Sequence, residues 1–175
     1  MTPPRLRFLN YEIESHMKSR SLTLGGNSFV IAFTGTGNLF YPDAPRAWGD
    51  LDQEWMCFLS CEVLQFSDPA GAVWDRWGPN FDGLHILTGF SSLAYAGTGF
   101  PGTFALNMLG FFVIPPASIV NAWFNAANAC GTGTPAALGP IGPGGVWGFG
   151  DYYWGKGPVG PTIPASQIRG WWYLN

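Results

Sequence analysis

The strongest constraint on the fold is an apolar segment, residues 55–59, that ends abruptly in Ser60-Cys61-Glu62. Apolar side chains without alternation are typical of a strand that is buried on both faces inside a parallel sheet. In such sheets, ligands bind beyond the carboxyl ends of the strands. The segment therefore predicts a central strand over residues 55–60 that presents Cys61 at the rim of the sheet.

Other segments carry the patterns of strands or helices. The clearest is 118–130, where apolar residues recur at the i, i+3, i+4 spacing of one helix face, between an N-cap at Ser118 and a stop at Gly131. Strands that alternate with helices predict an α/β fold with a mostly parallel sheet covered on both faces, a three-layer sandwich. The other predicted elements are strands over 8–13 (an edge strand), 28–33, 84–90 (with a break at Gly89) and 135–141, a helix over 68–77 capped by Asp68, and a helix over 104–109 capped by Thr103. The strands at 28–33 and 55–60 are expected to be neighbours, and any site is expected between the loop 34–38 and residues 60–62 at their ends.

The expected organisation is a single domain over residues 1–175, because this length suits one sizeable core. Residues 142–175 combine glycine and proline with many large aromatic side chains. A segment so aromatic is unsuited to disorder, so we expect an ordered tail that covers the body of the domain. Its tryptophans and tyrosines are expected to pack in the core or in an interface rather than to line a ligand cleft.

The composition is poor in charge. Charged residues make up 11% of the chain and aromatic residues 17%, whereas an average soluble domain has roughly 25% charged residues. Such a chain is expected to hide part of its surface, which predicts a protein partner or a homo-oligomer. A net charge of −3 without a basic stripe argues against binding to nucleic acid.

The sequence predicts neither a membrane span nor export. The longest apolar run, residues 108–114, stops at Pro115-Pro116 and is much shorter than the roughly 20 residues that a spanning helix needs. The first residues are not followed by an apolar signal region. On the predicted strand, Cys57 and Cys61 would lie about 13 Å apart, too far for a disulfide. Reduced thiols favour a cytoplasmic location.

A buried strand that ends in a glycine loop, followed by one that ends in Ser-Cys, resembles the caspase-like cysteine peptidases: caspases, gingipains, legumains and bacterial domains of the CHAT type. The sequence more closely resembles an uncharacterised bacterial domain family that shares this layout. The resemblance covers roughly residues 28–173 and implies a caspase-like three-layer α/β sandwich. The segments that carry it are Phe33-Thr-Gly-Thr-Gly-Asn38, Leu59-Ser-Cys-Glu-Val-Leu64, 77–90, Ala122-Trp-Phe-Asn-Ala-Ala127 and 151–159.

The resemblance also implies site residues. Caspase-like peptidases attack with a cysteine thiolate, use a histidine for proton transfer and hold the oxyanion with backbone N–H groups. Cys61 matches the nucleophile, and the N–H groups of Gly37 and Cys61 match the oxyanion donors. The histidine position falls on Thr36. Because threonine has no group that titrates near neutral pH, the catalytic dyad is broken.

Other side chains are poor substitutes for the missing base. His85 lies near the start of its predicted strand, at the opposite rim from Cys61 and some 15 Å away, and is expected to be a core histidine bonded to backbone. His16 lies in the polar N-terminal segment and is expected to be solvated. Carboxylates would raise the cysteine pKa rather than activate the thiol; those near the rim in sequence are Asp43, Asp50, Asp52 and Glu62.

No cofactor or metal is predicted. Cys57 is expected to be a core residue, and no second Cys or His pair follows it and Cys61 at zinc-ligand spacing. The loop 35–37 lacks the Gly-Lys-Ser/Thr ending of a phosphate-binding loop. Cys61 itself is open to two interpretations, a structural thiol or a reactive one.

Two functions remain open. About 27 residues precede the strand at 28–33, too few for the two strands and helices that precede the histidine strand in caspase-like sheets. The fold is therefore expected to be truncated at its N-terminal edge or completed by a partner. We favour a degenerate caspase-like domain that serves as a structural or protein-binding subunit. The alternative is an active cysteine hydrolase, a peptidase, that uses Cys61 as its nucleophile with an unidentified base.

Overall fold

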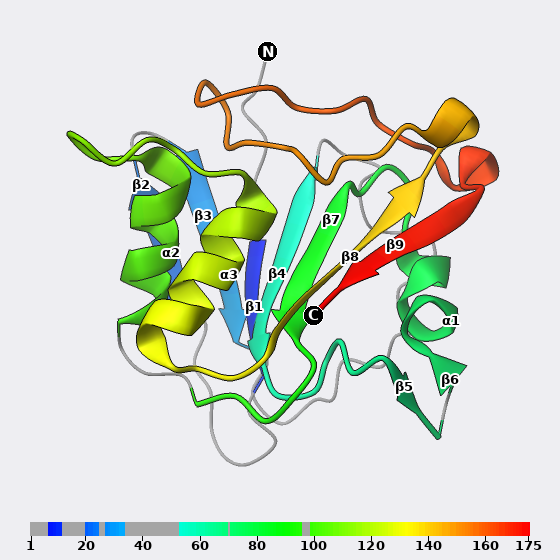
Figure 1. Ribbon diagram of the computed structural model, residues 1–175, viewed down its shortest axis with the longest axis horizontal. Coiled ribbons are helices and arrows are strands. Elements are labelled where there is room, and N and C mark those ends of the chain that lie inside the picture. Colours follow the sequence, from blue (N-terminus) through cyan, green and yellow to red (C-terminus); the bar gives the residue numbers. More distant parts are fainter. Residues whose placement is uncertain (1–6, 12–19, 25–26, 34–52, 70, 96–98) are drawn as a thin grey trace.

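The protein is described here by a computed structural model that covers residues 7–11, 20–24, 27–33, 53–69, 71–95 and 99–175, with side chains from residue 53 onward (Figure 1). It is a mixed α/β structure built on a seven-stranded sheet with the strand order β2-β3-β1-β4-β7-β8-β9. The strands are β1 (Arg7–Tyr11), β2 (Arg20–Leu24), β3 (Asn27–Phe33), β4 (Trp55–Ser60), β7 (Ile86–Phe90), β8 (Pro135–Ile141) and β9 (Gly170–Leu174).

The predicted central strand is confirmed. Strand β4 has the predicted bounds, lies in the middle of the sheet and pairs in parallel with both β1 and β7. Its side chains alternate between two buried clusters. Trp55 and Cys57 belong to one cluster, and Met56 and Phe58 belong to the other. This burial on both sides explains why the segment shows no polar alternation.

Helices cover both faces of the central strands. Helices α2 (Phe100–Leu109) and α3 (Ile119–Cys130) pack on the face of Trp55 and Cys57, and Figure 1 shows them side by side there. The short helix α1 (Val73–Trp77) contributes Val73 and Trp77 to the cluster on the other face. Two separate apolar clusters, one on each face of the sheet, thus form the core.

The expectation of a mostly parallel sheet is wrong, because the sheet is mixed. Strands β3, β1, β4 and β7 are parallel, whereas β2, β8 and β9 each pair antiparallel. The two helices between β7 and β8 explain why these two strands pair antiparallel. A single crossover helix would return the chain for a parallel strand, but the second helix brings it back to the end at which β7 finishes. Strand β8 therefore runs antiparallel to β7.

The strand predicted over residues 8–13 was expected at the edge of the sheet. This expectation is wrong, because β1 lies between β3 and β4. Gly89 does not break β7: it pairs with Ala136 inside the strand. A Cβ at position 89 would collide with Val63, so the glycine permits close packing of the segment that follows β4.

Helix α3 confirms the prediction over residues 118–130. The Oγ of Ser118 accepts a hydrogen bond from the N–H of Asn121 at 3.4 Å, and Gly131 ends the helix in the left-handed conformation with φ of 60°. The other helix predictions had wrong starts. Helix α2 begins at Phe100, so Thr103 lies inside it rather than at its cap.

Asp68 does not cap a helix over 68–77. It lies in a two-stranded hairpin of β5 (Ser67–Asp68) and β6 (Gly71–Ala72), and α1 begins only at Val73. The carboxylate of Asp68 instead lies 2.7 Å from Nη1 of the buried Arg76.

The segment from Gly142 to Arg169 is mostly irregular, with two short 3₁₀ turns, Pro143–Gly145 and Ala165–Gln167. In Figure 1 it runs along the end of the sheet at which β4 and β7 begin. The last residues were expected to belong to a loop, but they form β9, which pairs with β8 at the edge of the sheet.

Candidate functional site

The carboxyl edge of the sheet, where the parallel strands β1, β3, β4 and β7 end, is the place where the sequence predicts a site. The loop after β3 and Ser60-Cys61 were expected to follow neighbouring strands. That expectation is wrong, because β1 lies between β3 and β4. Two steps between strands separate the ends of β3 and β4 by about 10 Å.

Cys61 follows the last residue of β4 and is partly buried. Its Sγ makes two contacts with one residue: it accepts from the N–H of Ala94 at 3.3 Å and donates to the carbonyl oxygen of Ala94 at 3.3 Å. The next residue, Glu62, has a φ of 54° and an exposed side chain. Among the residues that the structure describes, the thiol is therefore held by backbone groups and not by a side chain that could take its proton.

The structure does not describe the residues that the resemblance implies as catalytic partners of Cys61. Thr36 and Gly37, the histidine position and the predicted oxyanion donor, fall outside the described residues, as do His16, Asp43, Asp50 and Asp52. Their predicted roles remain predictions.

His85 lies at the amino edge of the sheet, where β4 and β7 begin. The register pairs Trp55 with Ile86, which puts His85 beside Glu54, and the N–H of His85 donates to the carbonyl oxygen of Glu54 at 2.9 Å. From Trp55, the six residues of β4 lead to Cys61 at the other edge, a distance of about 20 Å at roughly 3.3 Å per residue. His85 is 1% exposed. The predicted burial and the predicted separation from Cys61 are confirmed.

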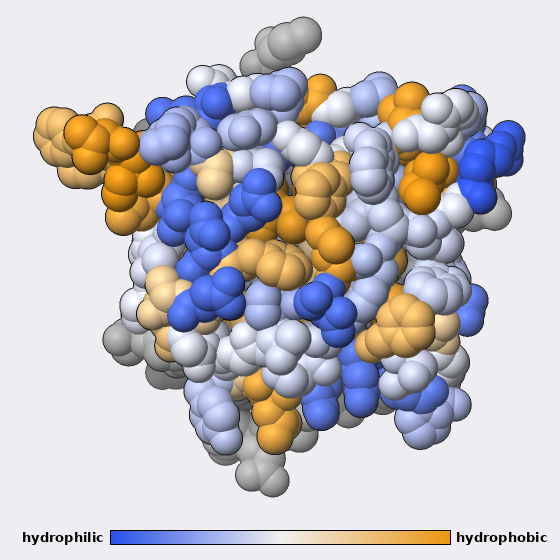
Figure 2. Space-filling view, in the orientation of Figure 1, coloured by the Kyte–Doolittle hydropathy of each residue, from blue (hydrophilic) through white to orange (hydrophobic). Residues whose placement is uncertain are grey.

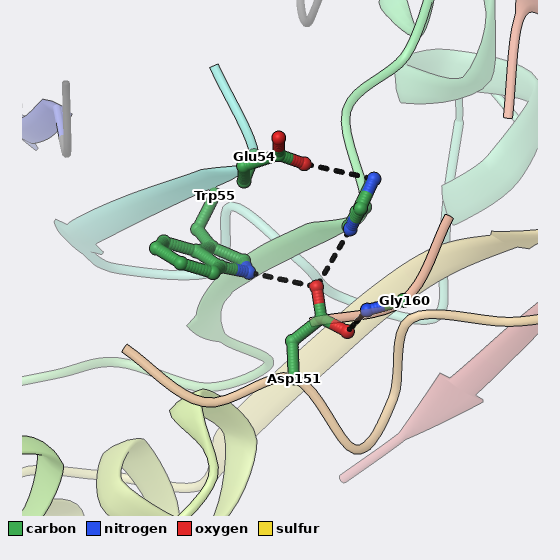
Figure 3. A network of polar contacts seen from close by, with 5 residues as sticks. Glu54, Trp55, Asp151 and Gly160 are labelled. Carbon is green, nitrogen blue, oxygen red and sulfur yellow. Dashed lines mark hydrogen bonds and ion pairs between the residues drawn. The ribbon is translucent and has the colours of Figure 1, made fainter. Parts of the chain in front are cut away.

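The partners of the His85 ring are carboxylates, whereas backbone groups were expected. The Nδ1 atom lies 2.6 Å from Oδ2 of Asp151, and Nε2 lies 2.8 Å from Oε2 of Glu54 without the alignment of a hydrogen bond. Figure 3 shows that Asp151 also accepts from Nε1 of Trp55 at 3.1 Å and from the N–H of Gly160 at 2.7 Å. We call these five residues the His85 cluster.

The geometry of the His85 cluster defines its protonation. Each ring nitrogen faces a carboxylate oxygen, and two nearby negative charges favour the form of the ring in which both nitrogens carry a proton. Burial alone would lower the pKa of His85, but the contacts with Asp151 and Glu54 outweigh burial and raise that pKa from 6.5 to about 9. The folded protein therefore holds a buried imidazolium at neutral pH.

The tail closes this cluster against solvent. Asp151 is 2% exposed, and the backbone of the tail packs so closely on His85 that a Cβ at Gly148 would lie 2.8 Å from the Cβ of His85. The carbonyl oxygen of Asp151 also accepts from the N–H of Ile119, the first residue of α3, at 2.8 Å. The cluster thus joins the amino edge of the sheet, the start of α3 and the tail. Its closed form suits a structural role rather than catalysis.

A pH dependence of stability follows from the raised pKa of His85. A raised pKa means that the stabilisation is fully present below the unfolded-state value of 6.5 and is lost as the pH rises through about 9. Between these values, the free energy of unfolding should fall by about 1.4 kcal/mol per pH unit, about 3 kcal/mol in all. Urea titrations followed by tryptophan fluorescence, at several pH values from 6.5 to 9, measure this slope.

Cys57 sets the highest pH at which that experiment reports on His85 alone. Burial raises the pKa of its thiol to about 12, so ionisation of the unfolded-state thiol adds its own destabilisation above pH 9. A free energy of unfolding that stays constant from pH 6.5 to 9 would contradict a charged His85. Cys57 is fully buried, which confirms its prediction as a core residue.

Glu54 and Asp151 were not predicted as partners of His85. Asp151 carries a visible signal, since no Asp, Glu, Lys or Arg lies between Asp82 and Asp151. Asp151 ends this long uncharged stretch, and a carboxylate that is buried there needs a polar partner. No local pattern connects it to His85, which is 66 residues away in sequence.

The part of the chain that the structure describes holds no group of three or more His, Cys, Asp or Glu residues arranged to bind a metal ion. In the His85 cluster the imidazole lies between the two carboxylates, so their oxygen atoms do not converge on a common point. None of the described helices is long and apolar enough to cross a membrane.

Comparison with protein families gives a match over residues 15–175 to a family described as "Domain of unknown function (DUF6345)". Neither a curated protein nor a solved structure matches the chain. These comparisons do not link the chain to caspase-like peptidases. Because the family match covers nearly all of the sequence, the chain belongs to the DUF6345 family of domains of unknown function.

Proposed function

We propose that this chain is a degenerate caspase-like domain that works as a structural or protein-binding subunit and not as a peptidase. One observation carries the proposal: His85, the one histidine that the structure describes, is buried between two carboxylates at the edge opposite Cys61. The described residues therefore give Cys61 no neighbouring base, the proton acceptor that nucleophilic catalysis requires. Thr36, at the position of the usual histidine, supports the same conclusion.

The caspase-like fold is part of this proposal. Four parallel strands in the centre of the sheet and helices on both of its faces support it. The position of β1 between β3 and β4 departs from the layout in which the glycine-loop strand and the cysteine strand are neighbours. Such a departure separates the two halves of a catalytic site, which fits a domain that has lost catalysis.

The surface supports a binding role. The stretch between Asp82 and Asp151 contains no Asp, Glu, Lys or Arg, and its only ionisable nitrogen base, His85, is buried. Helices α2 and α3 belong entirely to this stretch. A monomer that stays soluble by charge repulsion would carry charge on these exposed helices. Their neutrality favours contact with a partner or with a second copy of the chain.

Thiol labelling tests the proposal. We expect Cys61 to react with iodoacetamide at pH 6 at a rate within about tenfold of that of Cys130, because the described residues offer its Sγ only the backbone groups of Ala94 and no side chain that could activate it. Cys130 is the matched internal control, since it is also a free and partly buried cysteine. Mass spectrometry of peptides after timed labelling gives the rate for each site.

Rapid labelling of Cys61 alone at pH 6 would contradict the proposal. It would reveal a thiolate of low pKa and favour the alternative, an active cysteine hydrolase. Light scattering tests the binding role separately: a stable homo-oligomer with an unreactive Cys61 supports a structural subunit.

A further inference from the structure

The connection between α2 and α3 contains an exposed apolar tip, residues 111–114, to which the proposed function assigns no role. Phe112 and Val113 are 92% and 93% exposed, and Phe111 and Ile114 on either side are 59% and 45% exposed. Figure 2 shows the tip as an orange projection at the upper left, at the position of the α2–α3 connection in Figure 1. Such exposure of four consecutive large apolar residues marks an interaction site.

The tip is an ordered turn that backbone hydrogen bonds close. The N–H of Phe111 donates to the carbonyl oxygen of Ile114 at 3.0 Å, and the N–H of Ile114 donates to the carbonyl oxygen of Phe111 at 2.9 Å. Phe112 adopts a φ of 48° at the turn, a conformation that costs energy for a bulky side chain. The rings of Phe111 and Phe112 contact edge to face at 4.4 Å. The backbone thus holds Phe112 and Val113 outward.

The backbone of the tip has half of its N–H groups paired. Those of Phe111 and Ile114 bond across the turn, Pro115 and Pro116 have none, and those of Phe112 and Val113 have no backbone partner among the described residues. An unpaired N–H group costs free energy when it leaves water for hydrocarbon. The tip therefore suits the interfacial region of a bilayer better than its hydrocarbon core.

The surroundings of the tip are neutral. Both helices that lead to it lack formal charge, as does the whole stretch between Asp82 and Asp151. A neutral surface has no charges to desolvate when it approaches lipid headgroups, so that free-energy cost is absent. Nor does it attract anionic lipid. A convex tip of two side chains also needs a surface that closes around it. A fluid bilayer does so, whereas a protein would need a matching recess.

We propose that the tip at residues 111–114 inserts Phe112 and Val113 into the interfacial region of a neutral lipid bilayer. The contact is peripheral and reversible, because a few apolar side chains give only marginal membrane binding. It goes beyond the proposed function and does not involve Cys61. The tip joins α3 at the end where Asp151 meets Ile119, on the side of the amino edge.

Flotation with phosphatidylcholine vesicles tests this inference. The double variant Phe112→Asn, Val113→Ser should bind the vesicles at least about tenfold more weakly than the parent protein, because the buried apolar area is lost. Asparagine tolerates the positive φ at position 112, and both side chains are almost fully exposed, so the fold is retained. Circular dichroism verifies this. Binding of the parent should not change between low and high salt.

The matched control is the double variant Leu93→Ser, Tyr95→Ser. These two side chains are 59% and 78% exposed, but they lie near Cys61 at the opposite edge, where Ala94 contacts the thiol. This variant should bind the vesicles like the parent. Equal binding by the tip variant and the parent, or no binding by the parent, would overturn the inference.

Two further outcomes would also overturn it. Binding only to anionic vesicles, with loss at high salt, would assign membrane contact to basic residues outside the tip. An oligomer in the parent that becomes a monomer in the tip variant, without vesicle binding, would assign the tip to self-association. Light scattering on the same samples distinguishes this case.

Discussion

Replacement of Asp151 with asparagine should lower the free energy of unfolding by about 3–5 kcal/mol, the cost of removing one partner from a buried ion pair. Asp151 accepts three contacts: Oδ2 faces the ring of His85 and Nε1 of Trp55, and Oδ1 faces the N–H of Gly160. Asparagine has one acceptor oxygen. In either orientation, its NH₂ group would face a donor.

The charge of His85 adds to the effect. Without Asp151, the imidazolium keeps only the poorly aligned contact with Glu54, so its pKa should fall and the slope of stability against pH should flatten between 6.5 and 9. Urea denaturation at pH 7 measures the stability loss, and the same titrations at higher pH measure the slope. These two readouts together separate the loss of charge pairing from a simple packing defect.

The matched control is Asp75→Asn, the same substitution at an exposed position in the first turn of α1. It should change stability by no more than about 0.5 kcal/mol. An Asp151 variant as stable as this control would show that the His85 cluster does not hold the tail against the sheet.

The second large effect is expected at Trp123, where substitution with alanine should lower the free energy of unfolding by about 3–5 kcal/mol. The side chain is fully buried in α3 and makes edge-to-face contacts with Phe100 at 4.7 Å and Phe104 at 5.3 Å. Its Nε1 donates to the carbonyl oxygen of Gly89 at 2.8 Å. Alanine removes the ring contacts between the two helices and the bond to β7 together.

Trp123→Phe separates these contributions. Phenylalanine retains most of the packing but not the hydrogen bond, so its loss should be smaller than that of alanine. Trp147→Ala is the control for removal of a tryptophan, since Trp147 is 53% exposed, and it should cost less than half as much. Chemical denaturation followed by far-ultraviolet circular dichroism suits all three variants, because it does not depend on tryptophan emission. Equal losses for Trp123→Ala and Trp147→Ala would contradict the role of Trp123 in the core.

Where a local pattern decides the structure, the sequence is sufficient. Residues 55–60 lack polar alternation because both faces of β4 are buried, so the strand could be predicted with its bounds. Residues 118–130 combine helical periodicity with a serine cap and a glycine stop, and α3 follows that pattern. The burial of Cys57 follows from its place in the same strand. The roles of Thr36 and Gly37 remain predictions.

Pairing over long distances in the sequence was decided only by the tertiary structure. The position of β1 between β3 and β4 depends on which strand edges meet, and the direction of β8 depends on the second helix of the preceding pair. The ring of His85 finds Asp151 because the tail returns over the amino edge of the sheet. Local periodicity reports whether a residue is buried, but which groups meet there depends on the path of the whole chain.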